Sequence, residues 1–397
     1  MSSNQPAIVP VRRASQRAAE MPRSAIREIM ALAAGRPNVI HLEVGEPDFS
    51  TPQHIIDAAF KAASIGWTKY SPNAGLPALR RQVATRASRH GGEQPIVPEQ
   101  VVITTGAIGA LYSALMAVID AGDEVLIPDP GWPNYEAIAH LAGAKPVRYQ
   151  QSASRGFLPD AAEITDLITP RTKALLINTP GNPSGAVFPA SLMAEIAAIV
   201  RRTGIYLVSD EIYEDIVFES EHVSAAADTP ADRVFIVSGL SKTYAMTGWR
   251  LGWLICPPSL SPIVAGLQEP VTSCASTIAQ KAGEAALGGD QKSVAELREI
   301  FRRRRDVVVD VFANTGLLPV TPQGAFYALI NIGSTCQRSL EFAKDFLIAC
   351  NTAVVPGVTF GPSCDQYVRA AFTTSDEQLR EGLQRMRAHI ERRAGGG

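Results

Sequence analysis

Short apolar runs alternate with amphipathic stretches through the middle of the chain. β-Branched and other apolar residues predict buried strands at 101–104, 124–128, 146–149, 173–177, 205–209, 234–237 and 251–256. Stretches whose apolar residues recur at helical spacing, such as 189–202, separate most of these runs. Strands that alternate with helices predict a mostly parallel sheet covered on both faces. Ligands of such sheets bind at the carboxyl ends of the strands.

The two ends of the chain show a different pattern. Helical spacing predicts helices at 25–34, 292–313, 340–350 and 377–392, with strand-like runs that begin at 323 and 367. Ser24 is placed to cap the first of these helices. Residues 1–20 are polar and poor in aromatics, which predicts an arm with little structure of its own. The arginine run 302–305 is interpreted as a solvated helix face.

The composition describes an ordinary globular protein of 397 residues, with 46% hydrophobic residues, 19% charged residues and a net charge of −2. No basic region stands out, which argues against nucleic acid or an anionic membrane as the main partner. No apolar run reaches the length of a membrane span and no signal peptide is evident, so we expect a cytoplasmic protein. The five cysteines contain no CxxC pair, which favours free thiols over a disulfide framework or a zinc site.

Lys242 lies between two predicted core strands, in the segment SGLSKTYAMTGWR at 238–250. Burial lowers the pKa of an ammonium group and makes the neutral amine, a nucleophile for carbonyls, accessible. Arg250 carries a planar, permanently charged group suited to a phosphate. Pyridoxal phosphate requires both, because it carries an aldehyde and a phosphate. The alternative is a lysine that extends from a turn into solvent, with Arg250 in a surface ion pair.

Two more segments with suitable chemistry follow predicted strands. The glycine turn 106–109 opens an apolar helix, so its backbone N–H groups can face a phosphate. It is not a GxGxxG fingerprint, which disfavours a dinucleotide site. Trp132 follows the strand at 124–128 and can either stack on a pyridine ring or fill the core.

Asp210 and Tyr213 follow the strand at 205–209, and their spacing places them on one face of a helical turn. A carboxylate that faces a pyridine nitrogen favours the protonated ring. The alternative for Asp210 is an aspartate that binds backbone amides at the start of a helix.

The segment around Lys242 resembles the cofactor-lysine motif of the class I/II aminotransferases, which are fold-type I pyridoxal-phosphate enzymes. NTPGNPSG at 178–185 is similar to the family's NPxxNPTG segment, with Ser184 in place of threonine. VRAAF at 368–372 resembles the family's VRLSF-type strand, and GEPDF at 45–49 its N-terminal substrate segment. The resemblance runs from about Leu42 to Phe372.

This resemblance implies an α/β fold with two domains. The large domain, 50–289, would contain a mostly parallel seven-stranded sheet between helices. The small α+β domain would combine 15–49 with 290–397. The segment 68–80, a loop that enters a helix and contains Tyr70, resembles the segment whose tyrosine reaches the cofactor phosphate of the neighbouring subunit, which implies a homodimer. From the residues alone, Tyr70 could equally be an ordinary loop tyrosine packed on Pro72.

The resemblance also implies the role of individual residues. Lys242 would hold pyridoxal 5'-phosphate as a Schiff base and move the substrate's α-proton, and Asp210 would pair with the pyridine nitrogen. Tyr213 would bind the phenolic oxygen. The other cofactor-binding residues would be Tyr70, Gly106, Ala107, Ile108, Trp132, Asn182, Ser241 and Arg250. The substrate-binding residues would be Gly45, Trp132, Asn182 and Arg369, with the arginine on the α-carboxylate.

We therefore expect an aminotransferase that moves the amino group of an L-amino acid to a 2-oxo acid, either 2-oxoglutarate or pyruvate. Ile108 stands where some aspartate-selective relatives have lysine, and 272–276 contains no arginine for a distal carboxylate. Neutral or aromatic donors should thus react at least as well as aspartate.

Three alternatives stay open from the sequence. One is a C–S β-lyase with the same cofactor anchors. The second is a non-catalytic ligand-binding regulator, disfavoured because little chain precedes Leu42. The third is a nucleotide-linked oxidoreductase, disfavoured by the missing fingerprint. The six histidines are dispersed, with no HExxH and no GxSxG, so we expect neither a metal site nor a Ser-His-Asp triad.

Overall fold

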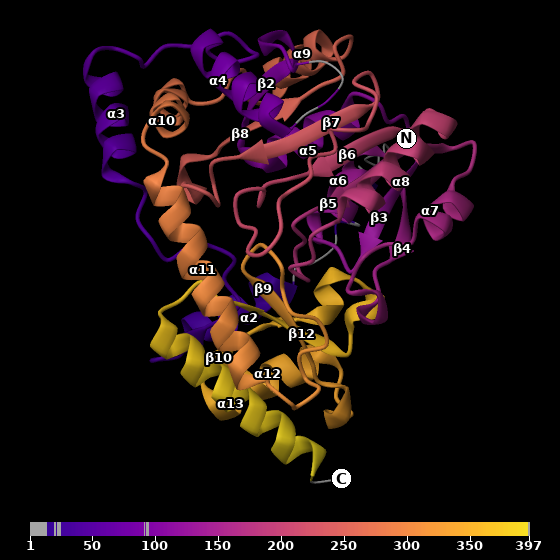
Figure 1. Cartoon of the computed structure of the whole chain (residues 1–397), viewed down its shortest axis with the longest axis vertical. Coiled ribbons are helices and arrows are strands. Elements are labelled where there is room, and N and C mark those ends of the chain that lie inside the picture. Colours follow the sequence, from indigo (N-terminus) through magenta and orange to yellow (C-terminus); the bar gives the residue numbers. More distant parts are fainter. Residues whose placement is uncertain (1–13, 20, 22–24, 91, 93–94, 396–397) are drawn as a thin grey trace, which may run out of the picture.

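The computed structural model describes residues 14–19, 21, 25–90, 92 and 95–395. Figure 1 shows a large sheet with its helices in the upper part of the view and a smaller group of elements below it. The long helix α11 (Lys292–Val311) descends from the first group into the second. Ser24 and residues 1–13 lie outside the described residues, so the predicted cap and most of the predicted arm are not seen.

Within the described residues, the large sheet has seven strands in the order β2-β8-β7-β6-β5-β3-β4. Only β8 is antiparallel to its neighbours β2 and β7; the other pairs are parallel. The predicted mostly parallel seven-stranded α/β fold is therefore confirmed. The strands are β2 (Val101–Thr105), β3 (Glu124–Asp129), β4 (Lys145–Gln150), β5 (Thr172–Asn178), β6 (Tyr206–Asp210), β7 (Val234–Gly239) and β8 (Leu251–Ile255).

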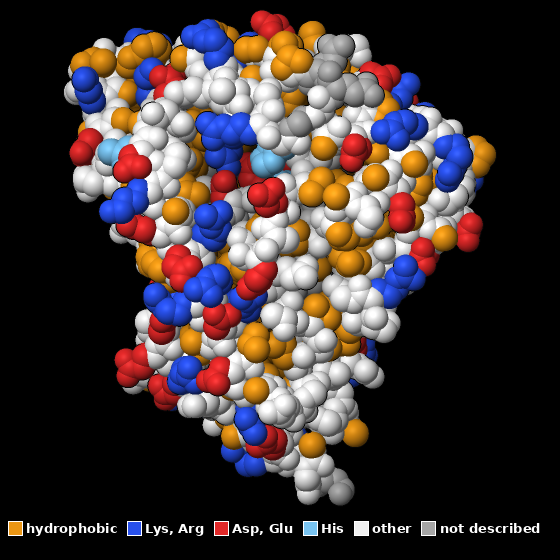
Figure 2. Space-filling view, viewed as in Figure 1, with side chains coloured by type: hydrophobic (Ala, Val, Ile, Leu, Met, Phe, Trp, Pro, Cys, Tyr) orange, Lys and Arg blue, Asp and Glu red, His pale blue; other side chains and the backbone are white. Residues whose placement is uncertain are grey.

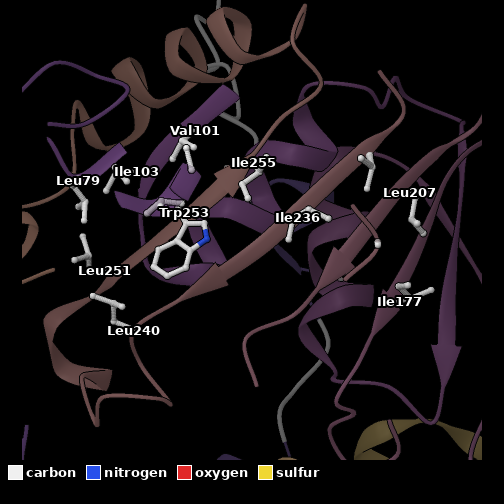
Figure 3. Close-up of a cluster of buried hydrophobic side chains, with 14 of the residues drawn as sticks. Leu79, Val101, Ile103, Ile177, Leu207, Ile236, Leu240, Leu251, Trp253 and Ile255 are labelled. Carbon is white, nitrogen blue, oxygen red and sulfur yellow. The ribbon is translucent and has the colours of Figure 1, made fainter. Parts of the chain in front are cut away.

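Helices cover both faces of this sheet. Successive residues of a strand point to opposite faces, so Ile236 joins one apolar layer and Phe235 the other. Figure 3 shows the first layer, where Trp253 lies among side chains from neighbouring strands. On that face pack α4 (Pro77–Ala87), α7 (Ala161–Leu167), α8 (Ala190–Thr203) and α10 (Thr277–Gly288), and α3 (Gln53–Ser64) packs against α10. On the other pack α5 (Gly106–Met116), α6 (Asn134–Ala142) and α9 (Ser261–Thr272).

The smaller group of elements has its own core. An antiparallel sheet has the order β11-β12-β9, and β1 pairs with β10 in parallel. The β1–β10 pair joins the N-terminal segment to the C-terminal part, and on this basis we propose that 15–49 and 290–397 form the small domain. The strands are β1 (Ile40–His41), β9 (Tyr327–Asn331), β10 (Thr352–Ala353), β11 (Val355–Pro356) and β12 (Tyr367–Ala371). The helices besides α11 are α1 (Gln16–Ala19), α2 (Ala25–Ala34), α12 (Ser339–Cys350) and α13 (Asp376–Ala394).

Most predicted boundaries agree with the structure within two residues. The turn 106–109 is the first turn of α5 rather than a loop before it. Asp210 is the last residue of β6, and Tyr213 lies in the hydrogen-bonded turn that follows the strand and not in a helix. Short 3₁₀ segments lie at Ser88–His90, Pro98–Gln100, Ala153–Arg155, Thr247–Trp249, Gly333–Thr335, Gly357–Phe360 and Pro362–Cys364.

The interpretation of 302–305 as a solvated face was wrong for two of the four arginines. Arg304 is 4% exposed and binds Asp48 through both terminal nitrogens, at 2.7 and 2.8 Å. Arg305 is 5% exposed and pairs with Glu219. The inner side of α11 meets carboxylates from distant parts of the chain, and these partners make burial of the guanidinium groups tolerable.

The surface of the view in Figure 2 carries acidic and basic side chains interspersed over α11 and α13. The cysteines Cys256, Cys274, Cys336, Cys350 and Cys364 are free thiols. Among the described residues, no helix combines the length and apolar character that a bilayer crossing requires.

Candidate active site

A cavity of about 360 Å³ opens at the carboxyl ends of the central strands, where β5 ends at Asn178 and β6 at Asp210. Its walls come from both groups of elements, because Arg369 of β12 and the N-terminal Gly45 line it as well. Of the thirteen residues predicted for the site, eleven line this cavity: Gly45, Ala107, Ile108, Trp132, Asn182, Asp210, Tyr213, Ser241, Lys242, Arg250 and Arg369.

Lys242 lies in the turn that follows β7, with its side chain partly buried. Its Nζ donates a hydrogen bond of 2.7 Å to the carbonyl of Gly45 and lies 5.8 Å from the ring centre of Phe326. Burial lowers the pKa of this ammonium to about 8, and the cations Arg369 and Arg250 act in the same direction. With this pKa, about a tenth of the amine is neutral at pH 7, and the neutral amine is the nucleophile for carbonyls.

Asp210 is 3% exposed at the end of β6. Burial raises the pKa of its carboxyl group to about 6, although the hydrogen bond from Tyr135 opposes this shift. The Tyr135 hydroxyl donates to Oδ2 at 2.8 Å, and the Ile212 N–H to Oδ1 at 3.3 Å. The Asn178 side chain holds the Asp210 carbonyl at 2.9 Å. These hydrogen bonds fix the carboxyl group in the wall of the cavity, where its ionised form can bind a cationic group.

Tyr213 and Tyr327 share a hydrogen bond of 2.9 Å between their hydroxyl groups. Burial raises the pKa of both phenols, so both keep their protons at neutral pH. The guanidinium of Arg369 lies 4.4 Å from the ring centre of Tyr327, a cation–π arrangement. These contacts link the turn after β6 to the small sheet.

Arg369 is buried in β12, and one of its three guanidinium nitrogens has no hydrogen-bond partner among the described residues. Nη1 donates to Asn182 Oδ1 at 3.1 Å and Nη2 to the Glu43 carbonyl at 2.7 Å. Nε is buried without a hydrogen-bond partner among the described residues. Burial lowers the pKa of this arginine. A buried cation that lines a cavity and has an unpaired donor is suited to bind a carboxylate.

Gly106 brings the start of α5 against Arg250. Its φ is +70°, and a Cβ at this position would lie 2.6 Å from Arg250 Nη2. Only glycine allows this approach. Arg250 is itself in the left-handed region, at φ +52°, and its Nη1 donates to the Thr247 carbonyl at 2.8 Å. The N–H groups at the start of an 11-residue helix therefore lie next to a guanidinium, and this combination of donors suits a phosphate.

Gly106 and Tyr70 are the predicted residues that do not line the cavity. Gly106 lies directly against Arg250, which does line the cavity. Tyr70 is 88% exposed and does not line this cavity in the single chain.

Residues 37–386 match the family model for aminotransferase class I and II. The chain belongs to this family. Its cofactor is accordingly pyridoxal 5'-phosphate, and its reaction is the transfer of an amino group between an amino acid and a 2-oxo acid.

Known proteins resemble this aminotransferase over nearly its whole length. Aspartate/prephenate aminotransferase of Thermus thermophilus is 38% identical, over 88% of this chain and 90% of that protein. A double mutant of Thermus thermophilus aspartate aminotransferase has a TM-score of 0.91 and 36% identity, over 96% of this chain and 100% of the other. Aromatic aminotransferase of Pyrococcus horikoshii has a TM-score of 0.86 and 36% identity, over 93% and 99%.

The residues of the cavity fit the cofactor of this aminotransferase. The first turn of α5 and the guanidinium of Arg250 lie together at the cavity, where both could bind the phosphate. A partly buried amine and a buried carboxyl group line the same space, as an aldehyde and a ring nitrogen require. The unpaired Nε of Arg369 is left for a substrate carboxylate.

Several residues of the site do not appear in the sequence prediction. Tyr135 follows Trp132 by three residues, and Tyr327 ends the segment QGAFY at 323–327. The only signal in the sequence for either residue is an aromatic side chain close to a glycine. Their partners Asp210 and Tyr213 are distant in sequence, and only the fold brings them together. Ile26 and Met30 of α2 also line the cavity.

Proposed function

We propose that Lys242 is the cofactor lysine of this aminotransferase and that Asp210 is its partner at the cofactor ring. The observation that carries the proposal is the pairing of opposite pKa shifts in one cavity. Burial lowers the pKa of the amine to about 8 and raises that of the carboxyl group to about 6. Such shifts on groups that line one cavity are typical of catalytic residues.

The cofactor, when bound, supplies an electron sink for the pair released at the substrate α-carbon. The first turn of α5, at Gly106, Ala107 and Ile108, would hold its phosphate together with Ser241 and Arg250. Asp210 would hold the ring nitrogen, and the Tyr135 hydroxyl keeps this carboxyl group in place. The phenolic oxygen would be bound by Asn182 and Tyr213, with Trp132 against the ring.

Arg369 would bind the substrate α-carboxylate, since Nε is unpaired and Nη1 already orients Asn182. The carbonyl of Gly45, which now accepts from Nζ of Lys242, lies at the same end of the cavity. The neutral amine of Lys242 would take the proton from the α-carbon and return it on the cofactor side, as general base and then general acid.

The cavity favours neutral or aromatic amino donors at least as much as aspartate. Among the described lining residues, the cations are Lys242, Arg250 and Arg369, and each has a role above. The rest of the wall includes the apolar Ile26, Met30 and Ile108. A second carboxylate would therefore lack a cation in this chain. The similar proteins include both an aspartate/prephenate and an aromatic aminotransferase, so their names do not decide the preference.

The active unit would be a cytoplasmic homodimer in which Tyr70 reaches the phosphate of the neighbouring site. Phe60, Ile65 and Tyr70 are 73%, 65% and 88% exposed in the single chain. Large apolar side chains this exposed, close together in the sequence, are consistent with an interface with another protein.

Lys242→Ala tests the central assignment. The variant should lose the carbonyl-reactive chromophore of the purified protein and at least about a thousandfold in kcat, since both the anchor and the general base disappear. Turnover at the wild-type rate would remove Lys242 from the mechanism. If the wild-type enzyme instead releases pyruvate and ammonia from a cysteine conjugate without transferring the amino group, its activity is that of a β-lyase.

A further inference from the structure

A cluster of charged side chains lies on the α4 side of the sheet, outside the active-site cavity. It consists of Arg86, His90, Glu211, Glu214, Asp215 and His222, of which Glu211 is 1% exposed. Two of the six histidines that look dispersed in the sequence meet here, with the rings of His90 and His222 5.5 Å apart. The three acidic residues all follow Asp210 within five positions.

Donors from the protein already occupy the carboxylates of this cluster. Glu211 Oε1 accepts from Ser209 at 2.8 Å and from the Ala225 N–H at 2.9 Å, and Oε2 contacts His222 Nε2 at 2.9 Å. Glu214 Oε2 contacts His90 at 3.2 Å. Glu211, Glu214 and His222 lie close enough to share a metal ion, but Arg86 pairs with Glu214 at 3.3 Å. We therefore interpret the cluster as an ion-pair network.

Arg86 connects this network to the two segments that carry the catalytic groups. It pairs with Glu214 and Asp215, which lie in the turn after Asp210. Glu214 Oε1 also accepts from the Ser238 hydroxyl of β7 at 2.9 Å. Asp215 Oδ2 accepts from the Thr243 hydroxyl at 2.7 Å. One guanidinium thus ties the end of β6, the end of β7 and the lysine turn together.

Thr243 is the direct neighbour of Lys242, and the two side chains point to different places. Lys242 lines the cavity, whereas Thr243 is 3% exposed and its hydroxyl lies in the network. A fixed Thr243 therefore limits how far the lysine turn can shift or rotate. Buried ion pairs add little net stability compared with apolar packing, and their better-attested contribution is a defined geometry. This network lies beside the turn after β6 and the turn that carries Lys242, where it can define the geometry of both.

We propose that Asp215 and Thr243, held by Arg86, are positioning residues that set the place of the Lys242 amine relative to Asp210. The proposal rests on the assignment of Lys242 as the cofactor lysine. Neither residue lines the cavity, so neither contacts the cofactor or the substrate directly. Their effect would act through the turn and would appear in cofactor binding and kcat rather than in substrate KM.

Thr243→Val tests this proposal, because it removes the hydroxyl and keeps the shape of the side chain. We expect kcat to fall about tenfold, the size of one lost hydrogen bond to a charged group, with KM for the amino donor nearly unchanged. Titration of cofactor-free protein with pyridoxal 5'-phosphate, followed by tryptophan fluorescence, should show a weaker Kd by a similar factor. Thr243→Ser should restore both values, and Asp215→Asn should resemble Thr243→Val.

Thr335→Val is the matched control, since this buried hydroxyl bonds the Ile332 carbonyl at 2.7 Å in the small domain. It should leave kcat and the cofactor Kd unchanged. Thr243→Val with wild-type kcat and wild-type cofactor Kd would overturn the proposal, whatever its melting temperature. If the Lys242→Ala variant binds the cofactor as tightly as the wild-type protein does, the assignment of Lys242 itself is wrong.

Discussion

The Tyr135 hydroxyl, in the first turn of α6, donates a hydrogen bond of 2.8 Å to Oδ2 of Asp210 at the end of β6. Both groups are buried, and the phenol keeps its proton because burial and the adjacent carboxylate raise its pKa. This bond favours the ionised form of a carboxyl group that burial would otherwise keep protonated to higher pH. The carboxylate must be ionised to hold a positive ring nitrogen.

Tyr135→Phe should therefore shift the acid limb of kcat/KM to higher pH. The hydrogen bond lowers the pKa of Asp210, now about 6, so its loss raises that pKa and leaves fewer carboxylates at pH 6. We expect kcat/KM at pH 6 to fall about tenfold, with a smaller loss at pH 8. A pH–rate profile measures this. Tyr149→Phe is the control, because Tyr149 is buried and bonds the Leu176 carbonyl outside the cavity; an equal shift there would contradict the explanation.

Lys242→Met should stabilise the cofactor-free protein at pH 7. Burial lowers the pKa of Lys242 from 10.5 to about 8, so between these pH values the unfolded chain binds more protons than the folded one. Stability therefore rises with pH through this window, and below pH 8 the buried ammonium costs on the order of 1–3 kcal/mol. Urea unfolding should show the variant to be more stable at pH 7, with the gain shrinking by pH 10.

Lys292→Met serves as the control, because Lys292 is 75% exposed. Its unfolding free energy should follow that of the wild type at both pH values. A gain for Lys242→Met that does not depend on pH would mean that packing, and not the ammonium, explains it.

Ile108→Lys should move the donor preference toward aspartate. Ile108 lines the cavity at the first turn of α5, and an ammonium there would supply a cation for a distal carboxylate. We expect the ratio of kcat/KM for aspartate to that for phenylalanine to rise about tenfold or more. Ile108→Met, which adds no charge, should leave the ratio near its starting value. A wild-type enzyme that already prefers aspartate strongly would refute the proposed preference.

Subunit complementation tests the contribution of Tyr70. Lys242→Ala and Tyr70→Ala should each have low activity as separate dimers. If Tyr70 acts in the neighbouring site, refolding the two together should restore activity, because a hybrid dimer contains one site with both Lys242 and the partner's tyrosine. No recovery in hybrids that are shown to form would place Tyr70 outside the site.

Arg304→Met and Arg303→Met compare two adjacent arginines of one helix. Arg304 is buried against Asp48, whereas Arg303 is exposed. Loss of Arg304 leaves a carboxylate without its partner and should cost about 3 kcal/mol of unfolding free energy. Loss of Arg303 should change it by about 0.5 kcal/mol or less. Similar losses in both variants, measured by urea unfolding, would mean that burial of Arg304 carries no special weight.

The order of strands and helices was predictable because the central strands are covered on both faces. Such strands read as continuous apolar runs, and each run at 101–104, 173–177 and 205–209 became a strand. The catalytic candidates were predictable for a related reason. Residues that directly follow parallel strands meet at one edge of the sheet, and Asp210 does so in this structure.

The failures share a physical cause, which is a partner distant in sequence. Nothing local to 302–305 indicates that Arg304 meets Asp48, a residue 256 positions away. His90 and His222 looked isolated for the same reason, although their rings lie 5.5 Å apart.

The sequence by itself determined the fold class, the family and the kinds of groups in the site, because periodicity and local motifs are properties of neighbouring residues. Tertiary structure alone decided which groups face one another. It brought Tyr135 into contact with Asp210, left Nε of Arg369 without a partner among the described residues and joined Thr243 to Arg86 through Asp215. Burial of the amine and the carboxyl group, and hence their shifted pKa values, follows from that packing and not from the order of residues along the chain.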